Sequence, residues 1–442
     1  MMTIEDFGRA LIKKAEPYVD DIDLIVARGN SLTYEIENKN VAPKLETGKT
    51  GISIRVLKDN KIGYSSITNL NVEEGLLAVK KAATDTKKTE ISDFADIEYK
   101  GRKIKLYDPQ VAELYYSDPG FLKEIAEAIV ERTYNCDKNL ENLQGSVGIG
   151  IGEKLICSKK GQVKAYELSR VEMDINVNHS DFDYYSLRKL PDNWEDIKSI
   201  GANLYANIPK EKASPDKLGV SKGKTIDVIF EPACVESVIR ALVSNKIYGS
   251  SKQNGLSNFS VGELIAGENF TLVDDGTADW MHTSYIIDDE GTQSQKNTVI
   301  DKGVLETFLY DRASAYKDGQ EPTGNGIGRP VSENFRGLYL EPSRKPLEKI
   351  IGEIDKGIQI NYLLGLHTAD TARASFICGV HGGKTIERGQ YKDQLEPGTW
   401  NVSGALFDLD EEPGILKDIE LSKETKNTGT AVMPWMKVKL KI

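Results

Sequence analysis

Hydrophobic and polar positions follow two different periods along the first part of the chain. Apolar residues recur at helical spacing from Ile4 to Ala15, and Thr3 stands where it can cap the helix. Further on, apolar residues occupy every second position, which is the period of a half-buried β-strand. This second pattern predicts four strands, at Asp23–Arg28, Ser31–Glu37, Gly51–Leu57 and Lys61–Ile67. The turn sequence Lys58-Asp59-Asn60 predicts that the last two strands form a hairpin.

Both periods return before residue 210. Helical spacing predicts three further helices, at Asn71–Thr86, Pro119–Tyr134 and Asn193–Ile208. The first of these is expected to pack through one apolar side, made by Leu76, Leu77, Val79 and Ala83. The strands Ser146–Ser158 and Gln162–Asn176 flank Lys159-Lys160-Gly161, which predicts a second hairpin.

A segment rich in Lys, Pro, Ser and Gly at Pro209–Lys224 marks a predicted domain boundary. Beyond it, a strand at Thr225–Glu231 leads into a helix from Pro232 to about Asn245, and short strands with long loops follow up to a last strand at Met436–Ile442. Strands therefore come as consecutive hairpins rather than alternating with helices. The expected class is α+β, with a mixed α+β N-terminal domain at 1–215 and a β-rich C-terminal domain at 220–442.

Composition narrows the class of protein further. The 442 residues include 57 Lys and Arg against 68 Asp and Glu, a formal net charge of −11. This balance makes direct nucleic-acid binding an unfavoured interpretation, because phosphate backbones require concentrated basic residues. The four cysteines form no CxxC pair, and no apolar run is long enough to span a membrane. With no signal-peptide pattern at the N-terminus, we expect a cytoplasmic protein without a membrane partner.

Metal-binding motifs are scarce. None of the four histidines is followed by Glu and no two lie three to five positions apart, so a helical HExxH site is excluded: His179, His282, His367 and His381. Cys378 and His381 are the one Cys/His pair at short spacing, and they would chelate a metal only across a turn. His367 and Asp370 form a second such pair. The alternative for each is a buried strand residue or a loop residue without a metal.

Two kinds of loop are candidates for binding. Pro322–Pro330 is glycine-rich but lacks the Lys-Ser/Thr of a phosphate loop, so a flexible surface loop is the favoured interpretation. If the loop binds a ligand, its exposed amides and an arginine suit a peptide, and the candidates are Gly324, Asn325, Gly326 and Arg329. The acidic sequences Asp274-Asp275-Gly276 and Asp288–Gly291 are predicted to be solvated turns rather than calcium sites.

Catalytic signatures of other hydrolases are missing from the sequence. The chain has no GxSxG motif, and Cys234 has no base close to it in sequence. Residues alone thus predict no catalytic group and no metal ligand.

Several segments together resemble the PmbA/TldD family, in the family's order and over nearly the whole chain. In the N-terminal half they are Gly51–Ser66 and the Cys157-Ser158 hairpin with Gly161. In the C-terminal half they are Asp288–Gly291, Gly303–Ala313, Pro322–Gly326, Asp370–Phe376, Gly383 and Val402–Gly404.

The resemblance implies an N-terminal α+β domain, a β-rich C-terminal domain and a cytosolic zinc metallopeptidase. In this family a catalytic subunit, TldD, pairs with a homologous subunit, PmbA or TldE, and the pair degrades unfolded peptides. The catalytic subunit carries HExxxH on the first helix of its second domain. The matching helix of this sequence, Glu231–Val243, has no histidine. The resemblance therefore implies a PmbA/TldE-like subunit that binds no cofactor itself, with zinc in the partner.

Three hypotheses remain open from the sequence. The first is a non-catalytic subunit that completes the peptide cavity of a TldD-like partner, in a heterodimer or as a homodimer. The second is a hydrolase with an unusual site, built from Cys378, His381 and a carboxylate. The third is a regulatory binding protein, as the family's historical name, modulator of DNA gyrase, suggests.

Overall fold

The computed structural model describes residues 2–89, 91, 93–94, 100–160, 163–178, 181–408 and 414–442. With 26% helix and 40% strand, a mixed N-terminal part and a β-rich C-terminal part, it confirms the predicted α+β class. None of the helices in these ranges is both long and apolar enough to cross a membrane.

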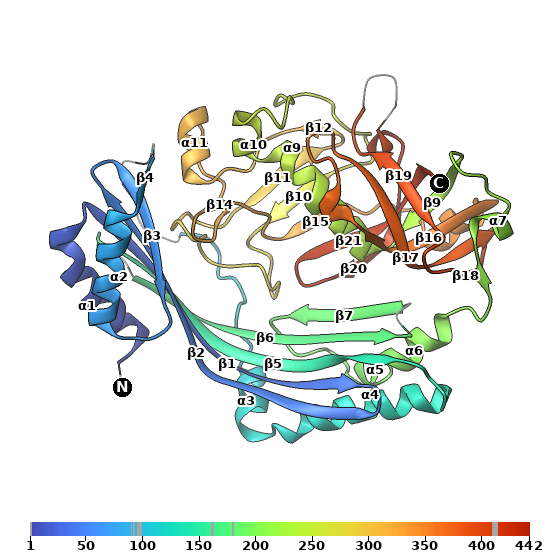
Figure 1. The fold of residues 1–442 in the computed structure, drawn as a ribbon, viewed down its shortest axis with the longest axis horizontal. Helices are drawn as coiled ribbons and strands as arrows, with labels where there is room; N and C mark the ends of the chain where they lie inside the picture. The colour runs from blue at the N-terminus through green and yellow to red at the C-terminus, as the bar shows by residue number, and fades with distance from the viewer. Residues whose placement is uncertain are drawn as a thin grey trace.

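A seven-stranded antiparallel sheet forms the N-terminal part, in the order β4-β3-β2-β1-β5-β6-β7. Its strands are β1 (Asp21–Glu37), β2 (Asn40–Lys58), β3 (Lys61–Ile67), β4 (Thr86–Lys88), β5 (Leu143–Ser158), β6 (Val163–Val177) and β7 (Asp181–Leu187). The four central strands are long and curve together beneath the C-terminal part (Figure 1). Both predicted hairpins, β2–β3 and β5–β6, are confirmed by their antiparallel registers.

Helices cover one face of this sheet toward its two ends. The helices are α1 (Ile4–Ala15), α2 (Val72–Thr84), α3 (Pro109–Ser117), α4 (Gly120–Cys136), α5 (Trp194–Lys198) and α6 (Ile200–Asn207), with a 3₁₀ turn at Glu16–Tyr18. The first two pack on the β1 residues Leu24 and Val26, and α4 packs near Leu32 and Ile36 of the same strand. These β1 residues have even numbers and share one face, so the opposite face of the sheet is turned toward the C-terminal part.

The predicted helices and strands of the N-terminal part are confirmed with three differences. Thr3 caps α1 as expected, since its hydroxyl accepts a hydrogen bond from the Asp6 backbone N–H at 3.0 Å. The two strands predicted on either side of Asn30 are one continuous strand, β1. The helix predicted at Asn193–Ile208 is broken at Ser199 into α5 and α6. Leu77, expected to be buried, is 66% exposed, because α2 packs through smaller residues such as Ala78 and Ala82.

A twelve-stranded mixed sheet forms the C-terminal part, with the main order β12-β11-β10-β15-β21-β9-β16-β17-β18-β8. Its strands are β8 (Lys212–Ala213), β9 (Thr225–Phe230), β10 (Leu272–Asp275), β11 (Lys296–Asp301), β12 (Val304–Leu305), β15 (Leu338–Leu340), β16 (Lys356–Leu364), β17 (Ser375–Glu387), β18 (Gln390–Leu395), β19 (Asn401–Ala405), β20 (Glu420–Asn427) and β21 (Ala431–Lys441). A separate pair joins β13 (Gly326–Ile327) and β14 (Ser332–Glu333). The division at residues 215–220 stays a prediction; β8, which precedes it, pairs with β18.

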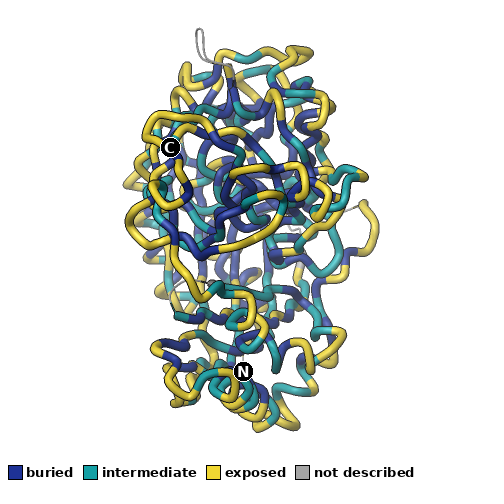
Figure 2. The backbone as a smooth tube through the Cα atoms, turned by 90° about the vertical axis from the view of Figure 1, so that its right-hand side faces the viewer, coloured by how far each residue is buried: buried dark blue, intermediate teal, exposed yellow. Residues whose placement is uncertain are grey.

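Short helices complete the C-terminal part. They are α7 (Pro215–Leu218), α8 (Pro232–Val238), α9 (Ser244–Ile247), α10 (Gly249–Gln253), α11 (Arg312–Asp318) and α12 (Leu347–Gly352), with 3₁₀ turns at Leu366–Thr368 and Ile415–Lys417. The predicted helix at Pro232–Asn245 is present as α8, a π-helical turn at Ile239–Val243, and α9. Its residues Val235, Val238 and Leu242 lie in the main hydrophobic core. Figure 2 shows this buried interior in dark blue, with exposed segments on the outer loops.

The acidic turn Asp288–Gly291 is not solvated as predicted but buried between the two sheets. Asp288 is fully buried and Glu290 is 3% exposed. Glu290 accepts a hydrogen bond from Nη1 of Arg55 at 2.7 Å, and Asp289 accepts one from Nζ of Lys154 at 2.7 Å. These cations lie on β2 and β5, so the turn attaches the C-terminal part to the face of the first sheet that is turned away from the helices.

The loop Pro322–Pro330 is also buried, which contradicts the prediction of a flexible surface loop. Asn325 is 0% exposed, and its Nδ2 donates to Oδ2 of Asp274 at 2.6 Å. The Gly326 N–H donates to Oδ2 of Asp288 at 2.9 Å. The loop and both acidic turns therefore bind one another through buried hydrogen bonds, which explains why neither turn is solvated.

Candidate functional site

Helix α8 turns one side toward a cavity between the two sheets. The cavity has a volume of about 420 Å³ and is lined by residues of α8, β6, β7 and β16. Glu236 and Arg240 enter from the helical segment, and Phe182, Tyr184 and Tyr362 supply aromatic walls from the strands. These five residues come from three segments of the chain that lie more than fifty positions apart, so the cavity exists only in the folded chain.

Glu236 is the central polar group of this cavity, and its carboxylate is fully engaged. It is 6% exposed. Nε of Arg240 donates to its Oε1 at 2.7 Å, the Thr430 hydroxyl donates to Oε1 at 2.5 Å, and the Thr428 hydroxyl donates to Oε2 at 2.6 Å. A buried carboxylate that accepts hydrogen bonds from one cation and two hydroxyl groups is held firmly in place.

A second carboxylate lies at the start of α8 and is likewise matched to a cation. Oε1 of Glu231 is 3.7 Å from Nζ of Lys426, which also forms an ion pair with Asp183. The neighbouring phenols are protonated: burial, and next the charge of Glu236, raise the pKa of Tyr184 above its usual range. Burial, followed by Tyr184, does the same to the pKa of Tyr362. This side of the helix therefore offers paired charges and neutral phenols.

The residues present on α8 do not fit a zinc ion. Catalytic zinc sites use three protein ligands, usually including histidine, and leave one position open. Helix α8 has no histidine, and its one sulfur donor, Cys234, is fully buried in the core, where burial raises the pKa of its thiol well above normal. Across the part of the chain that the structure describes, no three His, Cys, Asp or Glu side chains gather into a metal-binding group.

Cys378 and His381 do not come together. Both lie on β17, which continues through them without the turn that a chelate requires. Cys378 is 2% exposed and belongs to the main core, and burial raises the pKa of its thiol. His381, three positions later, lies on the other face and lines a separate pocket. The two candidate side chains lie apart because the strand sends them to opposite faces.

The structure also shows where most of the remaining candidate residues lie. His367 and Asp370 are both exposed, and the Asp370 carboxylate caps its own turn by accepting the Arg373 N–H at 3.0 Å. His179 lies outside the described residues. Nη2 of Arg329 is bound to Oδ1 of Asp23 at 3.0 Å.

The four peptide-binding candidates of the glycine-rich loop share this buried setting. Gly324, Asn325 and Gly326 are all buried. Arg329 has a side chain only 6% exposed. The premise of exposed amides is therefore wrong, because the loop uses its polar groups inside the molecule.

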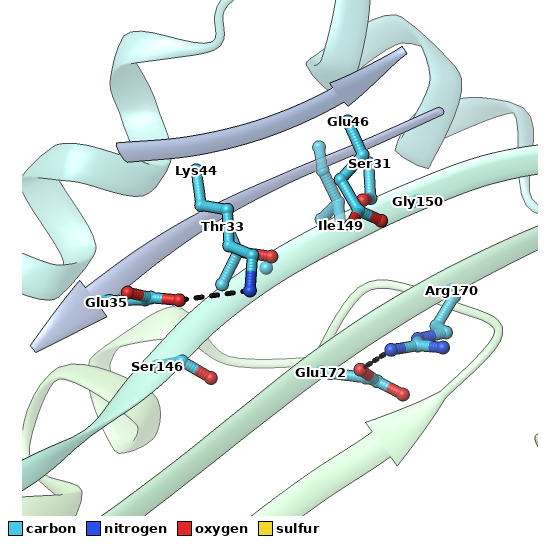
Figure 3. A pocket seen from close by; sticks show the side chains of 11 residues that line it. Ser31, Thr33, Glu35, Lys44, Glu46, Ser146, Ile149, Gly150, Arg170 and Glu172 are labelled. Atoms are coloured by element: carbon cyan, nitrogen blue, oxygen red, sulfur yellow. Dashed lines mark hydrogen bonds and ion pairs between the residues drawn. The ribbon is translucent and has the colours of Figure 1, made fainter. Parts of the chain in front are cut away.

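Two further pockets adjoin the cavity at α8. One, of about 310 Å³, shares Phe182 and Tyr362 with it. The other, of about 250 Å³, shares Glu172 and lies on the face of the first sheet turned away from the helices. Figure 3 shows this polar pocket, with side chains from β1, β2, β5 and β6 and an ion pair of 3.3 Å between Glu35 and Lys44. We call the three pockets together the interdomain groove.

Few features of the sequence indicate this groove. Glu236 and Arg240 lie in the helix that the family resemblance points to. Their place in the chain could therefore be predicted, but their contacts in the cavity could not. Phe182 and Tyr184 alternate along β7 in a way that resembles any strand with one apolar side. Their meeting with Tyr362 of β16 depends on how the two sheets pack.

Comparison with known proteins shows which family has this architecture. Residues 222–442 match the PmbA/TldA metallopeptidase C-terminal domain, and residues 22–85 match PmbA/TldA metallopeptidase domain 1. The first match alone spans half of the chain. The chain therefore belongs to the PmbA/TldD metallopeptidase family.

Individual relatives agree over almost the whole length. A metalloprotease of Methanocaldococcus jannaschii is 25% identical over 439 residues, which covers 93% of each chain. An uncharacterized protein of the same organism is 25% identical over 419 residues, covering 93% of this chain and 94% of that protein.

Solved structures show the same fold. TldE from Thermococcus kodakarensis superposes with a TM-score of 0.82 at 22% identity, covering 99% of this chain and 100% of TldE. A putative modulator of a DNA gyrase from Thermotoga maritima gives a TM-score of 0.81 at 20% identity, covering 99% of both chains. At these identities the likeness establishes the fold alone.

Proposed function

We propose that this chain is a PmbA/TldE-like, non-catalytic subunit of a cytoplasmic zinc metallopeptidase complex that degrades unfolded peptides. In this proposal it completes the substrate cavity of a homologous, TldD-like partner. The observation that carries the proposal is the paired Glu236 on α8. Where a catalytic subunit presents HExxxH, this helix presents a carboxylate bound to Arg240, Thr428 and Thr430.

The division of labour follows from the residues of each subunit. Zinc, and the activation of water that zinc supplies, belong to the partner. This chain contributes the interdomain groove, whose aromatic walls exclude water and whose polar floor can hydrogen-bond a peptide main chain. In this proposal the Glu236 carboxylate, which is already bound to Arg240, does not serve as a metal ligand.

Metal analysis and a peptidase assay on the separately purified chain test this proposal. We expect less than a tenth of an equivalent of zinc and no hydrolysis of an unfolded peptide. Near-stoichiometric zinc together with activity from this chain alone would contradict it. Alanine at both Cys378 and His381 is the matched variant, because a change in metal content or activity there would instead support the hydrolase hypothesis.

A further inference from the structure

The end of the interdomain groove farthest from the polar pocket is aromatic. Phe182 of β7 meets Tyr362 of β16 edge to face, with ring centroids 5.7 Å apart and an interplanar angle of 70°. Leu364 extends the same wall, and Asn176, Asn361 and His381 complete the lining of a pocket of about 310 Å³. The rings are half-buried, so the pocket is open to a ligand.

Large apolar side chains stand exposed beside this pocket. Leu364 is 56% exposed, and Ile377 on the neighbouring strand β17 is 79% exposed. Ile377, Gly379 and His381 share one face of β17, and Gly379 pairs directly with Leu364 of β16. A contiguous apolar surface at the mouth of a cavity marks a binding site more often than an isolated exposed leucine does.

We propose that this pocket, which we call the aromatic pocket, binds the side chain of one large apolar residue, such as Phe, Leu or Met, of an extended peptide lying in the groove. The inference rests on the proposed function, because it assumes that the groove receives peptides. It adds a side-chain preference that the proposed function does not contain.

The dimensions favour one side chain over a protein surface. The volume is at the lower end of the range for small-ligand pockets, about 300–1,000 Å³. A stable subunit interface requires about 800 Å² from each partner, far more than this pocket offers. A single side chain held by a main chain running through the neighbouring cavity therefore fits this site.

The chemistry of the lining selects an apolar residue. Among the residues whose side chains the structure describes, no Asp, Glu, Lys or Arg lines the aromatic pocket. A charged peptide side chain would lose water here without gaining an ion-pair partner, which disfavours its binding. The polar part of the lining is neutral: it includes Asn176 and Asn361, and the Asn361 Oδ1 already accepts a hydrogen bond from Nε2 of Gln359 at 3.2 Å.

The test compares two fluorescein-labelled, unstructured peptides of Gly and Ser that differ only in a central Phe or Ala. Fluorescence anisotropy with the full chain measures both affinities. We expect the Phe peptide to bind at least about tenfold more tightly. Gly379→Val adds bulk beside the Leu364 wall of the pocket: a Cβ at this position lies 3.8 Å from Leu364 Cβ and 3.9 Å from Asn401 Oδ1, which is ordinary contact. Leu364→Ala removes one wall instead.

Both variants should reduce the preference for Phe to less than about twofold, while Leu77→Ala, on the distant helix α2, should leave it unchanged. An equal preference in wild type and all variants would overturn the proposal. So would a result in which Leu364→Ala abolishes association with a TldD-like partner but keeps the peptide preference. Binding is measured without hydrolysis, so failure of the aromatic pocket leaves the zinc and activity measurements of the proposed function intact.

Discussion

The buried ionic contact at Arg55 gives the sharpest test of how the two sheets are held together. The Arg55 side chain is 0% exposed. Its Nε donates to both carboxylate oxygens of Asp23, at 3.2 and 3.1 Å, and its Nη1 donates to Glu290 at 2.7 Å. The guanidinium also lies 4.1 Å from the centroid of the Phe94 ring. Arg55 thus joins β1 to the buried turn of the C-terminal part.

Arg55→Leu removes the charge and keeps much of the apolar volume. Asp23 retains Arg329 at 3.0 Å, so Glu290 is the carboxylate left in the interior without a cation. Breaking a buried ion pair from one side costs about 3–5 kcal/mol, and the remaining Arg329 contact places the expected loss near 3 kcal/mol. That loss is a large part of the free energy of unfolding of a typical protein, which is roughly 5–15 kcal/mol.

Urea unfolding followed by circular dichroism measures this loss. The matched control is Arg132→Leu, which breaks an ion pair with Glu195 whose side chains are 38% and 60% exposed. We expect the control to lose less than about 1 kcal/mol. Adding Glu290→Gln to Arg55→Leu should recover part of the loss, because the unpaired charge disappears. Equal losses from Arg55→Leu and Arg132→Leu would refute the reasoning.

Three further predictions concern stability. Leu11→Ala, at a fully buried position of α1, should lower the free energy of unfolding by about 2–5 kcal/mol. Leu77→Ala, at a position that is 66% exposed, should change this free energy by less than about 0.5 kcal/mol, and equal effects of the two substitutions in urea unfolding would contradict the packing described for α2. Glu236→Ala should cost about 2–4 kcal/mol in the same assay, because it removes an acceptor of three hydrogen bonds, and an unchanged stability would argue against a structural role. Burial, and next the charge of Glu333, raise the pKa of Asp311 to about 6, so its contribution to stability is full below about pH 4 and is lost as the pH rises through about 6. Between pH 4 and pH 7 the free energy of unfolding of Asp311→Asn should therefore fall by about 2–3 kcal/mol less than that of the wild type. Parallel pH profiles of the two proteins would exclude the effect.

Local signals in the sequence were sufficient for many individual elements. The Thr3 cap predicts the start of α1 because the interaction spans only three residues. Asp59 and Asn60 predict the β2–β3 turn because both tolerate the positive φ angles of 51° and 56° found there. In such cases the information lies within a few neighbouring positions, so periodicity and turn chemistry predict the structure.

The acidic turns show where local reasoning ends. Asp288–Glu290 has the composition of a solvated turn, but Glu290 binds Arg55, which is 235 positions away. Nothing near the turn reveals that a cation will meet it in the interior. The same holds for Asn325, which is buried against Asp274, a residue 51 positions away.

Some features of the candidate site could be predicted from the sequence, and others depend on how the chain packs. The missing histidines of α8 could be seen directly in the sequence. Cys378 and His381 are close in sequence, yet β17 sends them to opposite faces. The aromatic pocket joins β7 to β16, and only the packing of the two sheets brings Phe182 to Tyr362.

The most direct test of the central claim is a titration of a purified, HExxxH-bearing TldD-like relative from the same organism with this chain, followed by hydrolysis of an unfolded peptide. The account predicts that neither subunit cleaves the peptide alone. Activity should rise with added chain and reach a plateau at one equivalent, with all the zinc bound to the partner. A partner that is fully active alone and unaffected by this chain would contradict the account.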